Sequence, residues 1–288
     1  MIFYDFLNRV LPGHLGTRLR FYKKLGYPLS LSAPRTFNEK VHWRKLYDRN
    51  PLFTVCADKL QARAFVQERI GEQYLIPLLY SGDSITAEQL KALEGEFVVK
   101  ANHNSGPVHM VEAGQPVDFD AIASSIQKQL QKPYAVKNGE WWYEPIPRRV
   151  LVERLLRGEQ QQWAEDYKFF VFNSGGRTEV VLQMTYDRET EANITFYDED
   201  LAILPFEIHV RNEYRPFVKP KNYEQMVTLA KKVAAGFDFC RVDLYNVDGE
   251  IYFGEMTFAP SGGTAPFKPQ EFDLWMGEKW TLPNASQQ

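Results

Sequence analysis

One hairpin sequence decides the fold of this chain, Arg241-Val-Asp-Leu-Tyr-Asn-Val-Asp-Gly-Glu-Ile-Tyr-Phe-Gly-Glu-Met-Thr257. Its two halves are rich in Val, Leu, Ile, Tyr and Phe, which favour strands, and the residues between them favour a tight turn. Three charged residues, Arg241, Asp243 and Glu255, stand inside these apolar halves. Because burying an unpaired charge is costly, charges in such places are usually paired, metal-bound or functional.

The length of the turn decides which face each charge occupies. We expect Val247-Asp248-Gly249 to form a three-residue loop closed by a left-handed glycine. That loop pairs Arg241 with Glu255 and Asp243 with Phe253, and it puts the three charged residues on one face. At a spacing of about 7–8 Å, the two carboxylates can share one hard cation. A two-residue loop would separate them, and an Arg–carboxylate ladder on a wet sheet face is the alternative.

Length and composition describe an ordinary folded protein. The 288 residues are 44% hydrophobic and 25% charged, which suits one large domain or two lobes. A net charge of -3 gives no global attraction to nucleic acid, so we expect no nucleic-acid partner. Cys56 and Cys240 form no disulfide framework and indicate free thiols in a reducing compartment. No apolar run approaches the roughly 20 residues that span a bilayer, and we therefore expect a cytoplasmic protein.

The first residues leave a second location open. The opening Met1–Val10 is too short and too charged for the apolar core of a signal peptide. Residues 1–27 are aromatic and basic, which is compatible with peripheral contact to a membrane or to a membrane-bound partner. A helix packed on the body of the protein is the alternative.

Helices dominate the first part of the sequence and strands the second. Capping boxes at Thr36-Phe-Asn-Glu39 and Thr86-Ala-Glu-Gln89 predict two helix starts. Further helices are expected over residues 55–70, 119–131 and 222–235, and further strands over residues 97–101, 150–153, 167–172 and 178–184. This order predicts an α+β protein with mostly antiparallel sheets.

A lysine stands at the end of one predicted strand. Lys100 is followed at once by the small, polar loop Asn102-His-Asn-Ser-Gly-Pro107, a pattern that suits a phosphate cradle. His103 in this loop is either a contact to phosphate or acceptor, or simply polar. We expect the loop to be less ordered than its strand until nucleotide binds. His42, His103 and His109 share no regular ligand spacing, so no zinc site is expected.

Two later strands add polar groups in a fixed order. Val150-Leu-Val-Glu153 leaves the core at its glutamate, where free backbone groups suit the edge of an adenine. Asp166 and Lys168 then share one face of the next strand, because side chains alternate. Trp141-Trp-Tyr143 between these strands is either a sugar-stacking platform or aromatic core. Each element alone has a structural explanation, and the order is the informative feature.

That order resembles the ATP-grasp superfamily, and within it the TupA-like branch, named for a teichuronopeptide biosynthesis protein. The resemblance covers roughly residues 35–270. It lies in Phe37-Asn-Glu-Lys40, Ala57-Asp-Lys59, Gly71-Glu-Gln-Tyr-Leu-Ile-Pro77, Phe97-Val-Val-Lys-Ala-Asn-His103, Asp166-Tyr-Lys-Phe169, Arg241-Val-Asp-Leu-Tyr245 and Tyr252-Phe-Gly-Glu-Met-Thr257.

The resemblance implies an ATP-grasp fold in which two lobes clamp ATP and Mg²⁺. It divides the chain into a mainly helical region (1–95), a small lobe with phosphate loop and adenine hinge (96–165) and a large lobe with the metal-binding hairpin (166–288). It implies that ATP is bound by Lys59, Lys100, Ser105, Gly106, Glu153, Arg154, Leu155, Asp166 and Lys168, with Asp166 near the ribose.

The same resemblance assigns the hairpin to metal binding and catalysis. Asp243 and Glu255 would ligate Mg²⁺, and Thr257 stands where relatives often carry Asn, which puts a second metal in doubt. Arg241 would hold the transferred phosphate or the acyl phosphate, and Lys168 is the second catalytic cation.

The reaction implied is amide formation between a carboxylate and an amine through an acyl phosphate, in a surface-polysaccharide setting with a sugar acid and an amino acid. Two alternatives stay open at this stage. One is phosphoryl transfer to a glycan or sugar on the same fold, and the other is a non-catalytic nucleotide- or glycan-binding module.

Overall fold

The computed structural model describes residues 14–134, 139–159, 164–186, 193–208 and 214–283. Its helices are α2 (Leu15–Leu25), α3 (Phe37–Tyr47), α4 (Leu52–Ala57), α5 (Gln61–Ile70), α6 (Ala87–Lys91), α7 (Phe119–Leu130), α9 (Tyr223–Ala234) and α10 (Glu271–Glu278). Short 3-10 turns are η1 (Glu72–Tyr74), η2 (Trp141–Tyr143) and η3 (Pro260–Gly263).

The strands form two antiparallel sheets. The order β1-β4-β2-β3 makes a four-stranded sheet from Leu78–Gly82, Val150–Arg154, Phe97–Ala101 and His109–Val111. The order β10-β9-β5-β6-β7-β8 makes a six-stranded sheet from Glu250–Thr257, Phe239–Val247, Glu165–Ser174, Arg177–Tyr186, Asn193–Tyr197 and Ile203–Leu204. The predicted α+β class with antiparallel sheets is confirmed.

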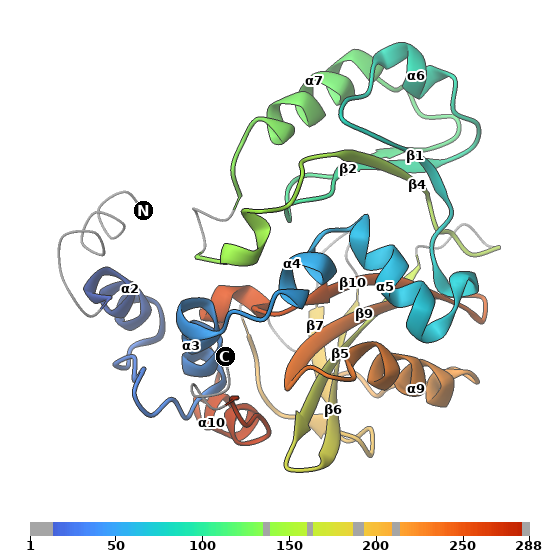
Figure 1. Ribbon diagram of the computed structural model, residues 1–288. Helices are drawn as coiled ribbons and strands as arrows, with labels where there is room; N and C mark the ends of the chain where they lie inside the picture. Colours follow the sequence, from blue (N-terminus) through green and yellow to red (C-terminus); the bar gives the residue numbers. More distant parts are fainter. Residues whose placement is uncertain (1–13, 135–138, 160–163, 187–192, 209–213, 284–288) are drawn as a thin grey trace.

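Each sheet has its own hydrophobic core. In Figure 1 the small sheet lies at the top under α6 and α7, and the large sheet lies below it with α9 packed alongside. Ile126, Phe97 and Val150 belong to the small core, whereas Phe53 and Trp280 belong to the large one. The region boundaries predicted at 95/96 and 165/166 stay predictions, although β1 joins the small sheet through β4.

Most predicted elements form, and one is interrupted. Both capping boxes are present, at Thr36 and at Thr86. The single helix predicted over residues 55–70 is wrong, because the chain leaves the helical conformation at Asp58 and resumes at Gln61. The Asp58 carboxylate accepts from the Leu60 N–H (2.9 Å), which stabilises a turn in place of the helix. This turn carries Lys59.

The decisive hairpin has a different turn from the one predicted. Asp248 (φ 51°) and Gly249 (φ 95°) form a two-residue loop with positive φ at both positions, as a type I′ turn requires. The ladder then slips at Gly254, so that Asp243 pairs with Glu255. The predicted loop and register are therefore wrong, yet the bulge restores the shared face that a two-residue loop alone would remove.

Glycine is well suited to this bulge. A Cβ at residue 254 would lie 3.0 Å from Tyr245 Cε2 and 3.1 Å from the Asp243 carbonyl oxygen. Arg241 pairs with Thr257 in the resulting register. Arg241, Asp243, Glu255 and Thr257 consequently project from the same face of the sheet, as predicted.

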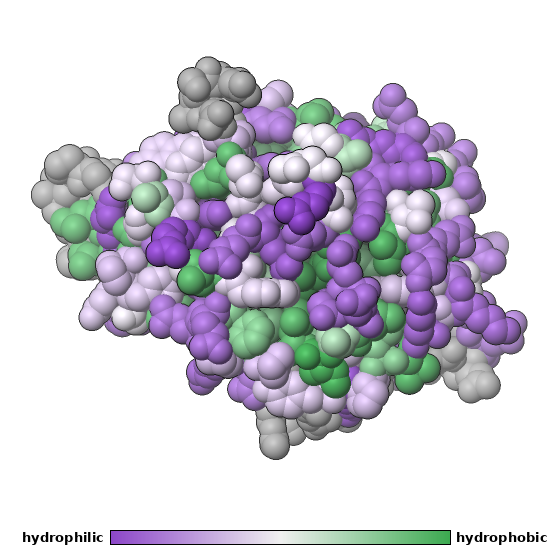
Figure 2. Space-filling model, turned by 90° about the horizontal axis from the view of Figure 1, so that it is seen from below, coloured by the Kyte–Doolittle hydropathy of each residue, from purple (hydrophilic) through white to green (hydrophobic). Residues whose placement is uncertain are grey.

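The outer surface is mixed. Figure 2 shows hydrophilic residues over most of the face seen from below, with apolar residues in small patches between them. On α2, Leu15 (37% exposed), Leu19 (43%) and Tyr22 (56%) form one stripe. Peripheral membrane contact through residues 1–27 stays a prediction, and residues 1–13 lie outside the described ranges. No helix within those ranges is long and apolar enough to cross a membrane.

A buried arginine joins α3 to the large sheet. Arg44 is fully buried, and its Nη1 donates to the Phe239 carbonyl oxygen (2.8 Å). Its Nη2 pairs with Asp238, and its Nε lies 3.4 Å from Asp48 Oδ2. The guanidinium also lies 4.3 Å from the centroid of the Trp280 ring. Removing this side chain would leave two carboxylates without their cation.

We therefore predict that Arg44→Leu lowers the free energy of unfolding by about 3–5 kcal/mol, the cost of breaking a buried ion pair. Urea denaturation measures the change. The matched variant Lys24→Leu, at an exposed position in α2, should change it by no more than about 0.5 kcal/mol. A small effect at Arg44 would mean that the two acids find other partners.

Candidate active site

A row of charged side chains crosses the inner face of the large sheet. Lys168 on β5, Asp243 on β9 and Glu255 on β10 are direct neighbours in the ladder, and Arg241 lies one step along β9. Arg241 Nε donates to Asp243 Oδ1 (2.7 Å). Lys168 Nζ donates to Asp243 Oδ2 and to Asp166 Oδ2, each at 2.6 Å. The predicted metal and catalytic residues therefore meet at one place.

The central carboxylate of this row is stabilised as an anion. Asp243 is 2% exposed. Burial alone would raise its pKa, but the Arg241 guanidinium and the Lys168 ammonium outweigh that effect and hold the pKa below its usual value. Asp243 thus stays charged inside the protein, which a metal ligand requires.

The two acids converge on a single point. Arg241 Nη2 donates to Asp243 Oδ2 (2.7 Å) and to Glu255 Oε1 (3.0 Å), so one positive atom lies between both carboxylates. Thr257 Oγ1 donates to the same Glu255 oxygen at 3.3 Å. These contacts form the arginine–carboxylate ladder that was the alternative to a metal site, and they also place the oxygens of two acids and a hydroxyl around one positive atom. The residues present therefore fit Mg²⁺, which prefers charged oxygen ligands.

The protein supplies only part of a coordination shell. Within the described ranges, no three acidic, histidine or cysteine side chains cluster as a metal site. Asp243 and Glu255 would supply charged ligands, and Thr257 a hydroxyl. Mg²⁺ commonly takes one or two carboxylates and completes its shell with water and substrate phosphates, so this small set suits a nucleotide-dependent site.

The two predicted phosphate lysines have different environments. Lys59 Nζ donates to the Asn104 carbonyl oxygen at 2.6 Å. Burial lowers the pKa of Lys59, and the nearby Glu255 carboxylate acts in the opposite direction. Lys100 Nζ lies 2.6 Å from Glu153 Oε2, and Arg63 binds the other oxygen of Glu153 at 2.9 Å. Lys100 is therefore an ion-paired residue.

An apolar cavity of about 340 Å³, here called the hinge cavity, lies between the two sheets. The predicted Lys100, Glu153, Arg154 and Leu155 line it, together with Ile76, Val98, Val108, Met110, Leu156, Ala164 and Tyr245. The size and lining suit a planar base. The N–H groups of Arg154 and Leu155 already donate to Pro77 and Glu96, each at 3.0 Å, so we expect the carbonyl groups of this turn and Leu156 to bind the base.

The first half of the predicted phosphate loop is buried and bonded to distant segments. Asn102 is buried, and its Nδ2 donates to Asp58 Oδ1 (2.8 Å) and to the Pro147 carbonyl oxygen (2.9 Å). His103 is 1% exposed, and its Nε2 hydrogen-bonds the Lys132 carbonyl group (3.2 Å). The ring of His103 is thus enclosed, which corrects the prediction that it contacts the nucleotide or the acceptor.

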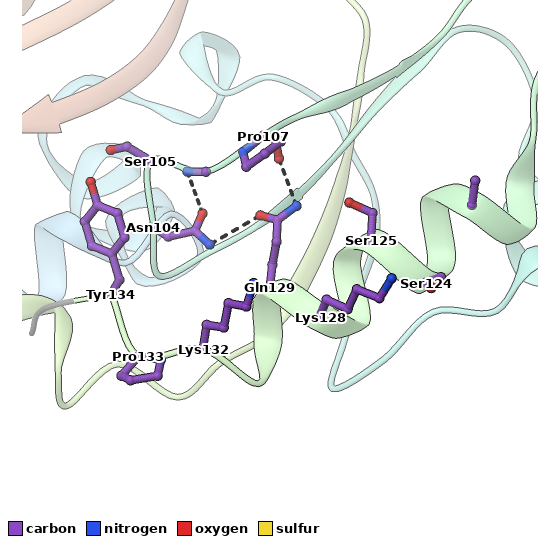
Figure 3. Close-up of a pocket in the computed structure, with 12 residues that line it drawn as sticks. Asn104, Ser105, Pro107, Ser124, Ser125, Lys128, Gln129, Lys132, Pro133 and Tyr134 are labelled. Atoms are coloured by element: carbon purple, nitrogen blue, oxygen red, sulfur yellow. Dashed lines mark hydrogen bonds between the residues drawn. The ribbon is translucent and has the colours of Figure 1, made fainter. Parts of the chain in front are cut away.

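The second half of the loop is attached to α7 by side chains. In Figure 3, Asn104 accepts from the Gly106 N–H (2.9 Å) and donates to Gln129, which in turn donates to the Pro107 carbonyl oxygen (3.1 Å). Ser105 is exposed. This half carries Ser105 and Gly106, the residues predicted to bind phosphate, and Gln129 connects it to α7.

The sequence did not predict an acid–base pair beside the hairpin. Burial lowers the pKa of Lys45 to about 8 and raises that of Glu140 to about 7, while each charge opposes the other's shift. Glu255 raises the pKa of Glu140 further. Lys45 Nζ donates to the Gly262 carbonyl oxygen at 2.6 Å. Lys45, Glu140 and Gly262 come from three segments far apart in the sequence, so no local sequence pattern predicts this pair.

The aromatic segment of η2 is divided. Trp142 is 1% exposed and packs against Phe53, with ring centroids 5.5 Å apart. It is a core residue. Trp141 and Tyr143 are half-buried, and Trp141 Nε1 donates to the Asp48 carbonyl oxygen (2.9 Å). The sugar-stacking alternative therefore does not apply to Trp142.

Comparison with known families gives one match that covers most of the chain. The family model described as TupA-like ATPgrasp matches residues 39–281. A search of curated proteins finds no match. The matched range contains every residue of the charged row, both phosphate lysines and the lining of the hinge cavity.

Solved structures with a similar arrangement are distant. A D-alanine–D-alanine ligase from Bacillus anthracis is 17% identical, with a TM-score of 0.37, over 71% of this chain and 56% of that chain. N5-carboxyaminoimidazole ribonucleotide synthetase from Thermus thermophilus is 14% identical, with a TM-score of 0.45, over 85% of this chain and 57% of that chain. The chain thus spans little more than half the length of these two proteins.

We predict that Lys100→Met weakens ATP affinity at least about tenfold, because it removes a positive charge from the cavity. It should also lower stability, since Glu153 keeps only Arg63. Adding Glu153→Gln should restore part of the stability while affinity stays low. Calorimetry and urea denaturation measure the two effects. Lys91→Met, an exposed control on α6, should change neither, and unchanged affinity for Lys100→Met would remove Lys100 from the site.

The prediction that the Asn102–Pro107 loop gains order when nucleotide binds now applies differently to its two halves. The Asn102 N–H donates to the Arg149 carbonyl oxygen (2.9 Å), so we expect it to be protected from hydrogen exchange with or without nucleotide. Ser105 and Gly106 should gain protection when a non-hydrolysable ATP analogue and Mg²⁺ bind. Equal protection of Ser105 and Gly106 in both states, with the analogue bound, would make the loop a rigid turn.

Proposed function

Because this chain belongs to the TupA-like ATP-grasp family, we propose that it is an ATP- and Mg²⁺-dependent ligase that joins a carboxylate to an amine through an acyl phosphate. One observation carries the proposal. The Lys168, Asp243, Glu255 and Arg241 row lies on the sheet face whose strand β9 also supplies Tyr245 to the hinge cavity.

Phosphoryl transfer needs positioning and charge neutralisation more than a protein nucleophile. Lys59 and Lys100 supply positive charge for phosphate oxygens, and Arg241 supplies it for the phosphoryl group in transit. Mg²⁺, held by Asp243 and Glu255, would add neutralising charge at the phosphates. Lys168 holds Asp166 and Asp243 in place, each at 2.6 Å.

The proposed reaction has two steps that balance. A carboxylate oxygen attacks the γ-phosphorus of ATP, and the bond to ADP breaks. The amine nitrogen then attacks the carbonyl carbon of the acyl phosphate, loses a proton and forms the amide as inorganic phosphate leaves. The acyl phosphate must be kept from water between these steps. Closure of the Ser105–Gly106 segment over the phosphates would exclude that water.

The substrates we propose are a sugar acid of a surface polysaccharide and an amino acid or amine. This part is supported by the family alone, whose TupA branch is linked to teichuronopeptide biosynthesis. The family therefore suggests the compounds for the first assay. A uronic acid supplies the carboxylate, and a panel of amino acids supplies the amine.

The test uses hydroxylamine as a minimal amine, because it converts any acyl phosphate into a hydroxamate. The protein is incubated with ATP, Mg²⁺ and D-glucuronate or D-galacturonate, and ADP and hydroxamate are measured. We expect both products in equal amounts. ADP without hydroxamate, with a phosphorylated sugar in the mass spectrum, would support kinase-like transfer. No acid-dependent ADP would contradict the proposed reaction with these acids.

We predict that Glu255→Gln lowers ADP formation at least about 100-fold at low Mg²⁺ and that higher Mg²⁺ restores part of it, because an amide is a weaker ligand for a hard cation. The half-exposed Arg241–Glu255 pair contributes at most about 1 kcal/mol to stability, so folding should be little changed. The control Glu278→Gln, on α10, should leave both unchanged. Full activity of Glu255→Gln at low Mg²⁺ would exclude a metal there.

A further inference from the structure

A second, smaller cavity lies beyond Arg241. It measures about 100 Å³ and is enclosed mostly by apolar side chains, among them Phe37, Phe196, Ile208 and Phe267. Arg241 itself forms part of the wall. The cavity therefore adjoins the point where Arg241 would hold the transferred phosphoryl group, and nothing in the nucleotide site accounts for it.

The wall includes Gln183, a polar side chain with no hydrogen-bond partner among the described residues. Gln183 on β6 is 6% exposed and pairs with Lys168 in the ladder, so it extends the charged row by one strand. Its side-chain amide makes no hydrogen bond to any residue that the structure describes. Because this amide lines the cavity, it is placed to bind a molecule that enters there.

Arg241 has donor capacity left on the same side. Its Nε and Nη2 are used by Asp243 and Glu255, whereas its Nη1 makes no hydrogen bond within the described part of the chain. The Nη1 of Arg241 and the amide of Gln183 thus offer two donors in one apolar cavity. Such a pair suits a carboxylate.

The order of groups along β9 gives the cavity its place in the reaction. Tyr245 lines the hinge cavity, Asp243 belongs to the metal site, and Arg241 lines the small cavity. Alternate residues of a strand follow one another on one face at about 6.6 Å. The hinge cavity, the metal site and the small cavity therefore follow one another along β9. A reactant in the small cavity would lie next to the acyl phosphate, on the side of its phosphate group.

Size decides which reactant fits. A volume of about 100 Å³ equals roughly three water molecules in the liquid, enough for a few carbon atoms. A sugar ring is larger, and its hydroxyl groups would lose their hydrogen bonds against these phenyl rings. The smaller reactant, the amine, must also bring its nitrogen within about 3–3.5 Å of the acyl carbon.

We propose that this cavity binds the amine substrate, an α-amino acid with a compact aliphatic side chain. Its side chain packs among the apolar residues, and its carboxylate binds the Gln183 amide and Arg241 Nη1. This inference rests on the proposed ligase function and deepens it. Gln183 would thereby determine which amines are accepted.

Calorimetry on the whole protein with Mg²⁺ and a non-hydrolysable ATP analogue tests the proposal. Glycine, L-alanine, L-valine and L-phenylalanine are the probes. We expect affinity to rise about fourfold for each methylene group buried between glycine and valine, and we expect phenylalanine not to bind. Absence of binding by all four, or tighter binding of phenylalanine than of valine, would overturn the proposal.

Two variants give the inference a residue-level test. Gln183→Leu should weaken valine binding at least tenfold and leave affinity for the ATP analogue unchanged. The matched control Gln225→Leu lies on α9, where its amide donates to the Tyr74 hydroxyl, and it should bind valine normally. Normal valine binding by Gln183→Leu would refute the site even where the chain is active.

The hydroxylamine assay on the unaltered protein separates this inference from the function on which it rests. Hydroxylamine has no side chain and does not need the cavity. Hydroxamate formation together with no amino-acid binding would leave the ligase standing and remove the cavity from it. Absence of acid-dependent ADP together with valine binding at Gln183 would instead contradict the reaction and keep the binding site.

Discussion

The structure depends most on one buried carboxylate, Asp243, held between Arg241 and Lys168. Burying this charge is costly, and two cations offset the cost only because three strands bring them together in register. The register in turn depends on the bulge at Gly254. Removing Arg241 or Lys168 would leave the buried Asp243 without one of its two cations, so fold and site are coupled here.

A second polar junction sets the opposite wall of the site. Asn102, which follows β2, bonds Asp58 and also the segment of Pro147 and Arg149, two parts of the chain far apart in the sequence. Asp58 also ends α4, so the same contact that fixes the phosphate loop interrupts the helix and presents Lys59. Tertiary hydrogen bonds override helix propensity at this point, because a continuous helix would carry Lys59 elsewhere.

The sequence correctly predicts those features of the fold that depend on residues close together in the chain. The capping boxes, the strand that ends at Lys100 and the shared face of Asp243 and Glu255 follow from spacing and composition. The route to that shared face was wrong, since Asp248-Gly249 forms a two-residue turn and Gly254 adds the bulge. Gly254 inside a strand was the available sign. The Lys45–Glu140 pair, the enclosed His103 and the cavity at Gln183 arise from distant segments, which no local pattern specifies.

The contacts of Arg241 explain what a metal ion would change in the site. Its Nη2 donates to Asp243 (2.7 Å) and to Glu255 (3.0 Å), so the two acids hold the guanidinium between them. A divalent cation on Asp243 and Glu255 would take over the role that Arg241 now has for both acids. Arg241 would then be released toward the phosphoryl group, so that metal binding itself would assemble the catalytic arrangement.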